Sequence, residues 1–163
     1  WTGLFFSGSL VQLPNPLVSN KNFTISLYLK TDIIWNKIIA ENNSNLWFSM
    51  QFNWGQQITG TLCYNVWWRQ IWNQVQTSDK FNDNQWHNIV IIYDWTLFWK
   101  IYADWVDKTK QNRINWGPIF SWDIFIWGRI WRNANYVWII DEVRIYNRAL
   151  SDSEVKALYD ATK

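Results

Sequence analysis

Residues 139–159, near the C-terminal end of the chain, constrain the fold more than any other segment because they predict a strand followed by a capped helix. Val143 and Ile145 alternate with more polar residues, which is the period of two expected of a strand with one buried face. Ser151 and Glu154 stand three positions apart, as in a capping box. A short helix is therefore expected to begin at Ser151.

The rest of the chain predicts short strands separated by gaps rich in turn residues. Residues 23–30 place alternate apolar side chains on one face, as in a sheet that is packed on one side. Asn, Asp, Ser and Gly fill the gaps between such segments. Further strands are expected at residues 37–40, 46–52, 58–64, 70–76, 87–93, 97–103, 124–126 and 139–146. Many short strands with almost no helix predict a two-sheet sandwich.

Four blocks, taken together, resemble a known family. They are residues 4–14, 22–31, 83–94 and 139–159, and the third begins its apolar alternation after Gln85-Trp86-His87. In this order and spacing they resemble a laminin-G-like (LamG-like), concanavalin A-like lectin/glucanase domain of the bacterial surface type. The resemblance implies an all-β, two-sheet antiparallel jelly-roll sandwich with one short C-terminal helix. It also implies a single domain over residues 1–163.

Composition and charge narrow the function classes. The 163 residues, 48% of them hydrophobic, are enough to bury one substantial core. The 15 basic and 13 acidic residues are scattered, so no basic stripe predicts a nucleic-acid partner. Neither a membrane-spanning run nor a signal peptide is visible, so membrane insertion by this domain is not expected. Cys63 is the only cysteine, which suits a disulfide-free bacterial surface module better than a small animal extracellular domain.

Tryptophan is the compositional anomaly, with 16 residues against six glycines. Trp95 and Trp105 each follow an aspartate where the family has an Asp-Gly turn, and Trp138 stands where a glycine usually precedes the closing strand. Glycine accepts a positive φ without strain, whereas an aromatic residue does not. These three positions therefore favour glycine over tryptophan.

Two explanations remain open for these tryptophans. In the first they are genuine, and either line a sugar-binding surface or are accepted at a cost in stability. In the second, which the glycine positions favour, the source reads the codon UGA as glycine, as a few bacterial lineages do. The native protein would then carry glycine at Trp95, Trp105 and Trp138.

Catalysis finds little support in the sequence. Glycoside hydrolases that share this fold need carboxylates at alternate strand positions, so that they point into one cleft. Asp141 and Glu142 are adjacent and are expected on opposite faces, with turn and ion-pair roles near Arg144. His87 is the only histidine, which excludes a cluster of histidine ligands and favours a structural strand residue. We expect a protein that is not an enzyme.

Calcium (Ca2+) is the only cofactor that the resemblance admits, because related laminin-G and pentraxin folds hold it at the sandwich rim. The family's Phe-Asp-Gly is here Phe6-Ser7-Gly8, which loses a carboxylate and weakens this expectation. No metal ligand is assigned from the sequence.

The strongest binding candidate is a segment where the family places a variable rim loop. Its guanidinium and amide groups are suited to sugar hydroxyls, and its aromatic rings to the apolar face of a pyranose. The candidate residues are Arg129, Trp131, Arg132, Asn133, Asn135 and Tyr136. A solvated loop pinned to the core by its aromatic rings is the alternative interpretation.

These observations predict a non-catalytic carbohydrate-binding or adhesion module of a larger cell-surface or secreted protein. The expected partner is a glycan or a surface protein. A protein-interaction or structural module of a surface assembly is the second hypothesis. A glycoside hydrolase of the concanavalin A-like clan is the third.

Overall fold

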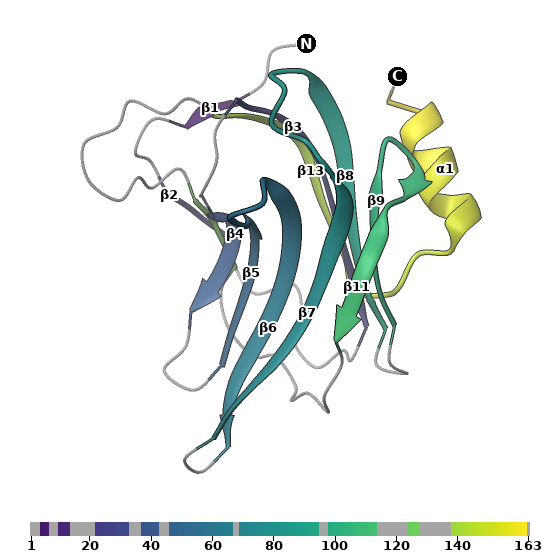
Figure 1. Ribbon diagram of the computed structural model, residues 1–163. Helices are drawn as coiled ribbons and strands as arrows, with labels where there is room; N and C mark the ends of the chain where they lie inside the picture. Colours follow the sequence, from purple (N-terminus) through teal and green to yellow (C-terminus); the bar gives the residue numbers. More distant parts are fainter. Residues whose placement is uncertain are drawn as a thin grey trace.

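The computed structural model describes residues 4–6, 10–13, 22–32, 37–42, 46–66, 69–94, 98–113, 124–127 and 138–162. In chain order the elements are β1 Leu4–Phe6, β2 Leu10–Leu13, β3 Phe23–Lys30, β4 Lys37–Asn42, β5 Leu46–Phe52, β6 Gln57–Val66, β7 Arg69–Lys80, β8 Trp86–Asp94, β9 Phe98–Ala103, β10 Val106–Asp107, β11 Thr109–Arg113, β12 Ile124–Trp127, β13 Trp138–Tyr146 and α1 Asp152–Asp160 (Figure 1). No helix within these ranges is long and apolar enough to cross a membrane.

The strands form two antiparallel sheets. One has six strands in the order β1-β13-β3-β8-β9-β10, and the other has seven in the order β11-β7-β6-β5-β4-β12-β2. Figure 1 shows α1 outside the sandwich, beside β8 and β9 of the six-stranded sheet. The predicted all-β, two-sheet antiparallel jelly roll with one short C-terminal helix is confirmed.

The main core lies between the two sheets. Alternate residues of β3 and β8 face it, and Trp99 of β9 is fully buried there. A Cβ added to Gly60 of β6 would stand 3.0 Å from Cγ1 of Val75 and 3.2 Å from Cζ3 of Trp99. The sheets therefore approach each other so closely at Gly60 that no larger residue fits without repacking.

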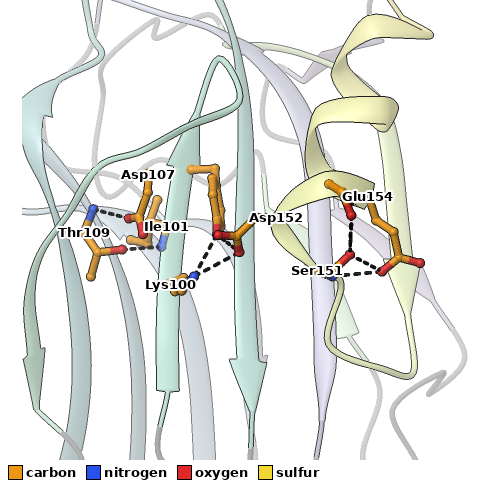
Figure 2. Close-up of polar contacts among 9 residues, drawn as sticks. Lys100, Ile101, Asp107, Thr109, Ser151, Asp152 and Glu154 are labelled. Carbon is orange, nitrogen blue, oxygen red and sulfur yellow. Dashed lines mark hydrogen bonds and ion pairs between the residues drawn. The ribbon is translucent and has the colours of Figure 1, made fainter.

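The C-terminal helix begins where the sequence predicts. Ser151 is the N-cap, and its side chain and that of Glu154 form a reciprocal capping box (Figure 2). Leu150 and Val155 on either side of the cap belong to a second apolar cluster, which joins α1 to the outer face of the six-stranded sheet. The hydroxyl of Thr24 in β3 adds a polar tie, because it accepts a hydrogen bond from the Leu150 amide at 3.0 Å.

A polar contact also holds the first turn of α1 to the sheet. Figure 2 shows Nζ of Lys100 reaching Oδ1 of Asp152, at 3.0 Å, and the Tyr102 hydroxyl donates to the same oxygen at 2.6 Å. Burial, reinforced by the Asp152 carboxylate, raises the pKa of Tyr102 to about 12. This cluster is a structural attachment of the helix.

Four strands were not among the strand expectations: β1, β2, β10 and β11. β11 reads Thr-Lys-Gln-Asn-Arg and lies at the edge of the seven-stranded sheet, so it needs no apolar alternation. β7 also continues to Lys80, beyond the predicted end at residue 76. A polar strand at a sheet edge leaves little pattern in the sequence.

Candidate functional site

All six predicted binding residues, Arg129, Trp131, Arg132, Asn133, Asn135 and Tyr136, lie outside the described residues. The strands on either side of them are described. Trp127 ends β12 and pairs with Leu10 of β2 in the seven-stranded sheet, whereas Trp138 begins β13 and pairs with Phe6 of β1 in the six-stranded sheet. The candidate segment is thus bounded by strand ends that belong to different sheets.

The start of β13 shares one end of the six-stranded sheet with several other described residues. Ile139, next to Trp138, pairs with Lys30 at the end of β3, and Lys30 pairs with Trp86 at the start of β8. Ala103, which ends β9, pairs with Ile89 of β8. We call this end, where β3 and β9 end and β8 and β13 begin, the His87 rim.

His87 is held at this rim by contacts on both ring nitrogens. Its Nδ1 lies 2.7 Å from Oδ2 of Asp104, and its Nε2 lies 3.0 Å from Oδ1 of Asp83. The ring also makes an edge contact with Phe81, whose centroid is 5.1 Å away. The histidine therefore links the β7–β8 connection to the β9–β10 turn.

The electrostatics of this link follow from its two carboxylates. The hydrogen bond that His87 donates to the Asp104 carboxylate is the main reason why the pKa of His87 is raised, with a further contribution from Asp83. With both nitrogens engaged, His87 is a structural residue of β8, as predicted. In the part of the chain that the structure describes, no three His, Cys, Asp or Glu side chains are grouped so as to hold a metal ion.

Asp141 and Glu142 occupy a bulge in β13. The pairing with β3 shifts register between Asp141 and Arg144, and Glu142 has a φ of 50°. The Glu142 carboxylate accepts a hydrogen bond from Arg144 at 2.6 Å, and Oδ1 of Asp141 accepts one from the Glu142 amide at 2.8 Å. The expected ion pair with Arg144 is confirmed for Glu142, whereas the expected turn is a bulge within β13, which the sequence did not predict.

The three tryptophans at family glycine positions differ in what the structure describes. Trp95 lies outside the described residues, and Trp138 is the first residue of β13. Trp105 has a φ of 65°, directly after Asp104 with a φ of 51°. Trp105 therefore occupies the left-handed conformation that favours glycine.

Sequence reasoning missed a set of polar side chains on the outer face of the seven-stranded sheet, of which Ser49, Thr59 and Thr61 are buried. Because Met50, Gly60 and Val75 face the core, the residues that alternate with them on β5, β6 and β7 face outward. These outward residues are Ser49, Gln51, Thr59, Thr61, Gln74 and Gln76, which we call the amide–hydroxyl face. Alternation of Ser, Thr and Gln with apolar residues is a visible signal, but it also fits an ordinary solvated sheet face.

The antiparallel jelly roll with a capped helix on its outer face places the molecule among the lectin-like sandwich domains. Residues 6–156 match the family described as the concanavalin A-like lectin/glucanases superfamily, and the chain belongs to this family. A search of curated proteins finds no match.

Solved structures share the fold at low sequence identity. The botulinum neurotoxin serotype D binding domain has a TM-score of 0.71 and 16% identity, covering 96% of this chain and 41% of that chain. The binding domain of Paraclostridial Mosquitocidal Protein 1 has a TM-score of 0.66 and 19% identity, covering 87% of this chain and 37% of that one. Our chain thus spans about two fifths of each toxin domain.

A third neighbour is matched over more of its own length. Domain 4 of AbnA, a GH43 extracellular arabinanase from Geobacillus stearothermophilus, was solved in complex with arabinotriose. Its TM-score is 0.68 at 24% identity, covering 91% of this chain and 71% of that chain. At these identities the likeness establishes the fold.

Proposed function

We propose that residues 1–163 form one LamG-like domain that serves as a non-catalytic carbohydrate-binding module of a larger secreted or cell-surface protein. The observation that carries the proposal is the position of segment 129–136 between Trp127 and Trp138, at strand ends of two different sheets. Loops at the ends of a rigid sandwich are where this architecture carries recognition. The complex of AbnA domain 4 with arabinotriose supports a glycan as the ligand.

Two glutamates of the described residues have structural partners, which supports a role without catalysis. Glu142 is engaged by Arg144, and Glu154 serves the helix cap. Adhesion to a surface protein is the second candidate, favoured by the fold shared with toxin binding domains.

A glycan array, followed by a paired substitution in the segment, tests the proposal. Arg132→Ala with Trp131→Ala removes a guanidinium and a ring, and we expect at least a tenfold loss of affinity because each group contributes on the order of 1–3 kcal/mol. The melting temperature should stay within a few degrees, as is usual for loop residues. Arg144→Ala, which removes a guanidinium already paired with Glu142, is the matched control and should bind normally.

Three results would contradict parts of this proposal. Full binding by the double variant would move the site away from segment 129–136. An array with no binder, with and without calcium, would favour the protein-interaction role. Hydrolytic activity that is lost in Glu142→Gln would show an enzyme.

A further inference from the structure

His87 meets a carboxylate at each of its two ring nitrogens, and a neutral imidazole cannot donate to both. Nδ1 lies 2.7 Å from Oδ2 of Asp104, and Nε2 lies 3.0 Å from Oδ1 of Asp83. An ionised carboxylate only accepts hydrogen bonds, and a neutral histidine has a single N–H. Both contacts are therefore hydrogen bonds only when the ring carries two protons and a positive charge.

The groups around the ring favour this charged form. The charged groups that act on His87 are Asp104 on the β9–β10 turn and Asp83 on the β7–β8 connection. β3 places the apolar Leu29 opposite His87, and its charged Lys30 lies on the other face of the sheet. The two carboxylates raise the pKa of His87, the hydrogen bond to Asp104 most, against the opposing effect of burial.

The two carboxylates differ in how firmly the protein holds them. Oδ1 of Asp104 accepts from the Asn88 amide at 3.0 Å, and the Asp104 amide donates to the Asn88 carbonyl at 2.9 Å. The Asp104 side chain is 36% exposed, whereas that of Asp83 is 57% exposed. Beyond the ring, Oδ1 of Asp83 accepts from the Gln85 amide at 2.9 Å, within its own turn. When His87 loses a proton, we therefore expect Nδ1 to keep its hydrogen toward Asp104.

Nε2 then presents a lone pair to Asp83. Two acceptors 3.0 Å apart repel each other, so the more exposed carboxylate should move away from the ring. The next residue, Asn84, has a φ of 62°, and its amide donates to the Thr31 carbonyl of the segment after β3 at 2.9 Å. Movement of Asp83 therefore weakens the support of the Asn84 and Gln85 amides.

We propose that His87 is a pH-dependent latch, which holds residues 83–85 against the β9–β10 turn when its ring is doubly protonated and releases them when its ring is neutral. Burial would raise the pKa of Asp83, but hydrogen bonds from the Gln85 amide and from His87 hold it below the ordinary value, so Asp83 stays ionised while His87 titrates. The latch closes as the pH falls through the pKa of His87. This inference does not depend on the proposed carbohydrate-binding function.

Amide hydrogen exchange by NMR tests the latch in the unmutated protein. Protection factors, corrected for the intrinsic effect of pH, are compared between about pH 5.5 and about pH 8.5. Those of Asn84 and Gln85 should fall roughly tenfold at the higher pH, because a charge-assisted hydrogen bond is lost. Those of Asn88 and Asp104 should stay within about twofold. The fall should follow the titration of the His87 ring nitrogens, and the neutral ring should carry its proton on Nδ1.

Substitutions at either end of the latch separate it from other effects of pH. His87→Gln cannot change its charge, so protection of Asn84 and Gln85 should become independent of pH. Asp83→Asn keeps an oxygen for the Gln85 amide but removes the charge, so it should lower the pKa of His87 and reduce the change in protection.

Asp107→Asn is the matched control. Oδ1 of Asp107 accepts from the Thr109 amide at 2.9 Å, which is the same arrangement, two residues apart, as that of Asp83 and Gln85. Asp107 is not among the groups that act on His87, so this variant should keep the full change in protection.

Three results would overturn the latch. The first is protection of Asn84 and Gln85 that stays within about twofold while His87 titrates. The second is a neutral ring with its proton on Nε2, because Asp83 would then be the partner that is kept. Both need only the unmutated protein, so neither depends on the folding of a variant. The third is a change in protection that persists in full in His87→Gln, which would assign it to another group.

Discussion

Replacing Trp105 with glycine is expected to stabilise the protein, which is an unusual outcome for removing a large side chain. Ala103 pairs with Val106, so Asp104 and Trp105 are the two central residues of a tight turn, with φ values of 51° and 65°. Positive φ at both positions is the requirement of a type I′ turn, in which glycine is strongly preferred at the second. A residue with a Cβ in this conformation costs roughly 1–2 kcal/mol.

The tryptophan side chain recovers part of that cost. Trp105 is 45% exposed, and Nζ of Lys156 lies 5.3 Å from the centroid of its ring. A cation–π contact at an exposed site contributes about 0.5–1 kcal/mol. The difference leaves a net gain of roughly 0–1.5 kcal/mol for Trp105→Gly. Each 1 kcal/mol corresponds to roughly 2–4 °C in melting temperature for a domain of this size.

Urea denaturation of the two proteins measures this difference directly. Trp105→Asn should fall between them, because asparagine tolerates the left-handed conformation better than tryptophan does. Trp54→Gly is the control, since Trp54 is 84% exposed and is not among the residues with a positive φ. A loss of 1 kcal/mol or more in Trp105→Gly would refute the argument from backbone strain.

Three further predictions concern the same rim, the helix cap and the native residues. His87→Gln should lower stability most at about pH 5–6, because the pKa of His87 is raised in the folded protein. The stability that follows from this shift is fully present below the unfolded-state pKa of about 6.5 and is lost as the pH rises through the folded-state pKa. Chemical denaturation of both proteins across pH 5–8 measures the difference, and a difference that grows toward pH 8 would contradict it. Ser151→Ala should cost about 1 kcal/mol by loss of the cap, whereas Ser151→Thr should retain most of the stability; equal losses in thermal melts would argue against the cap. Peptide masses of the native protein should show glycine at Trp95, Trp105 and Trp138, and intact tryptophan at all three would exclude the codon explanation.

The elements best predicted from the sequence are those whose signals are local. The capping box at Ser151 and the alternation in β3 each depend on residues a few positions apart, and both are found as expected. β11 was missed because its five polar residues lie at a sheet edge. The bulge at Glu142 was missed because strict alternation was assumed through β13.

The candidate sites also differ in how far the sequence alone predicts them. Segment 129–136 was chosen from residue chemistry and family position, and it stays a prediction. The pairing of Ser49 with Thr61 depends on the register of β5 against β6, which no local pattern specifies. Neither Oγ of Ser49 nor Oγ1 of Thr61 has a hydrogen-bond partner among the described residues, and only the packed sheet of the structure reveals this.

The β9–β10 turn connects the contacts of His87 to the strained backbone of Trp105. Asp104 is fixed from several directions: Oδ2 contacts His87, Oδ1 accepts from the Asn88 amide at 3.0 Å, and its own amide donates to the Asn88 carbonyl at 2.9 Å. None of these contacts involves the side chain at position 105. The positive φ of Trp105 is therefore imposed by its neighbours, and glycine would satisfy the same turn without strain. A glycine codon read as tryptophan would produce such a residue, because its neighbours set its conformation and its own Cβ is strained there.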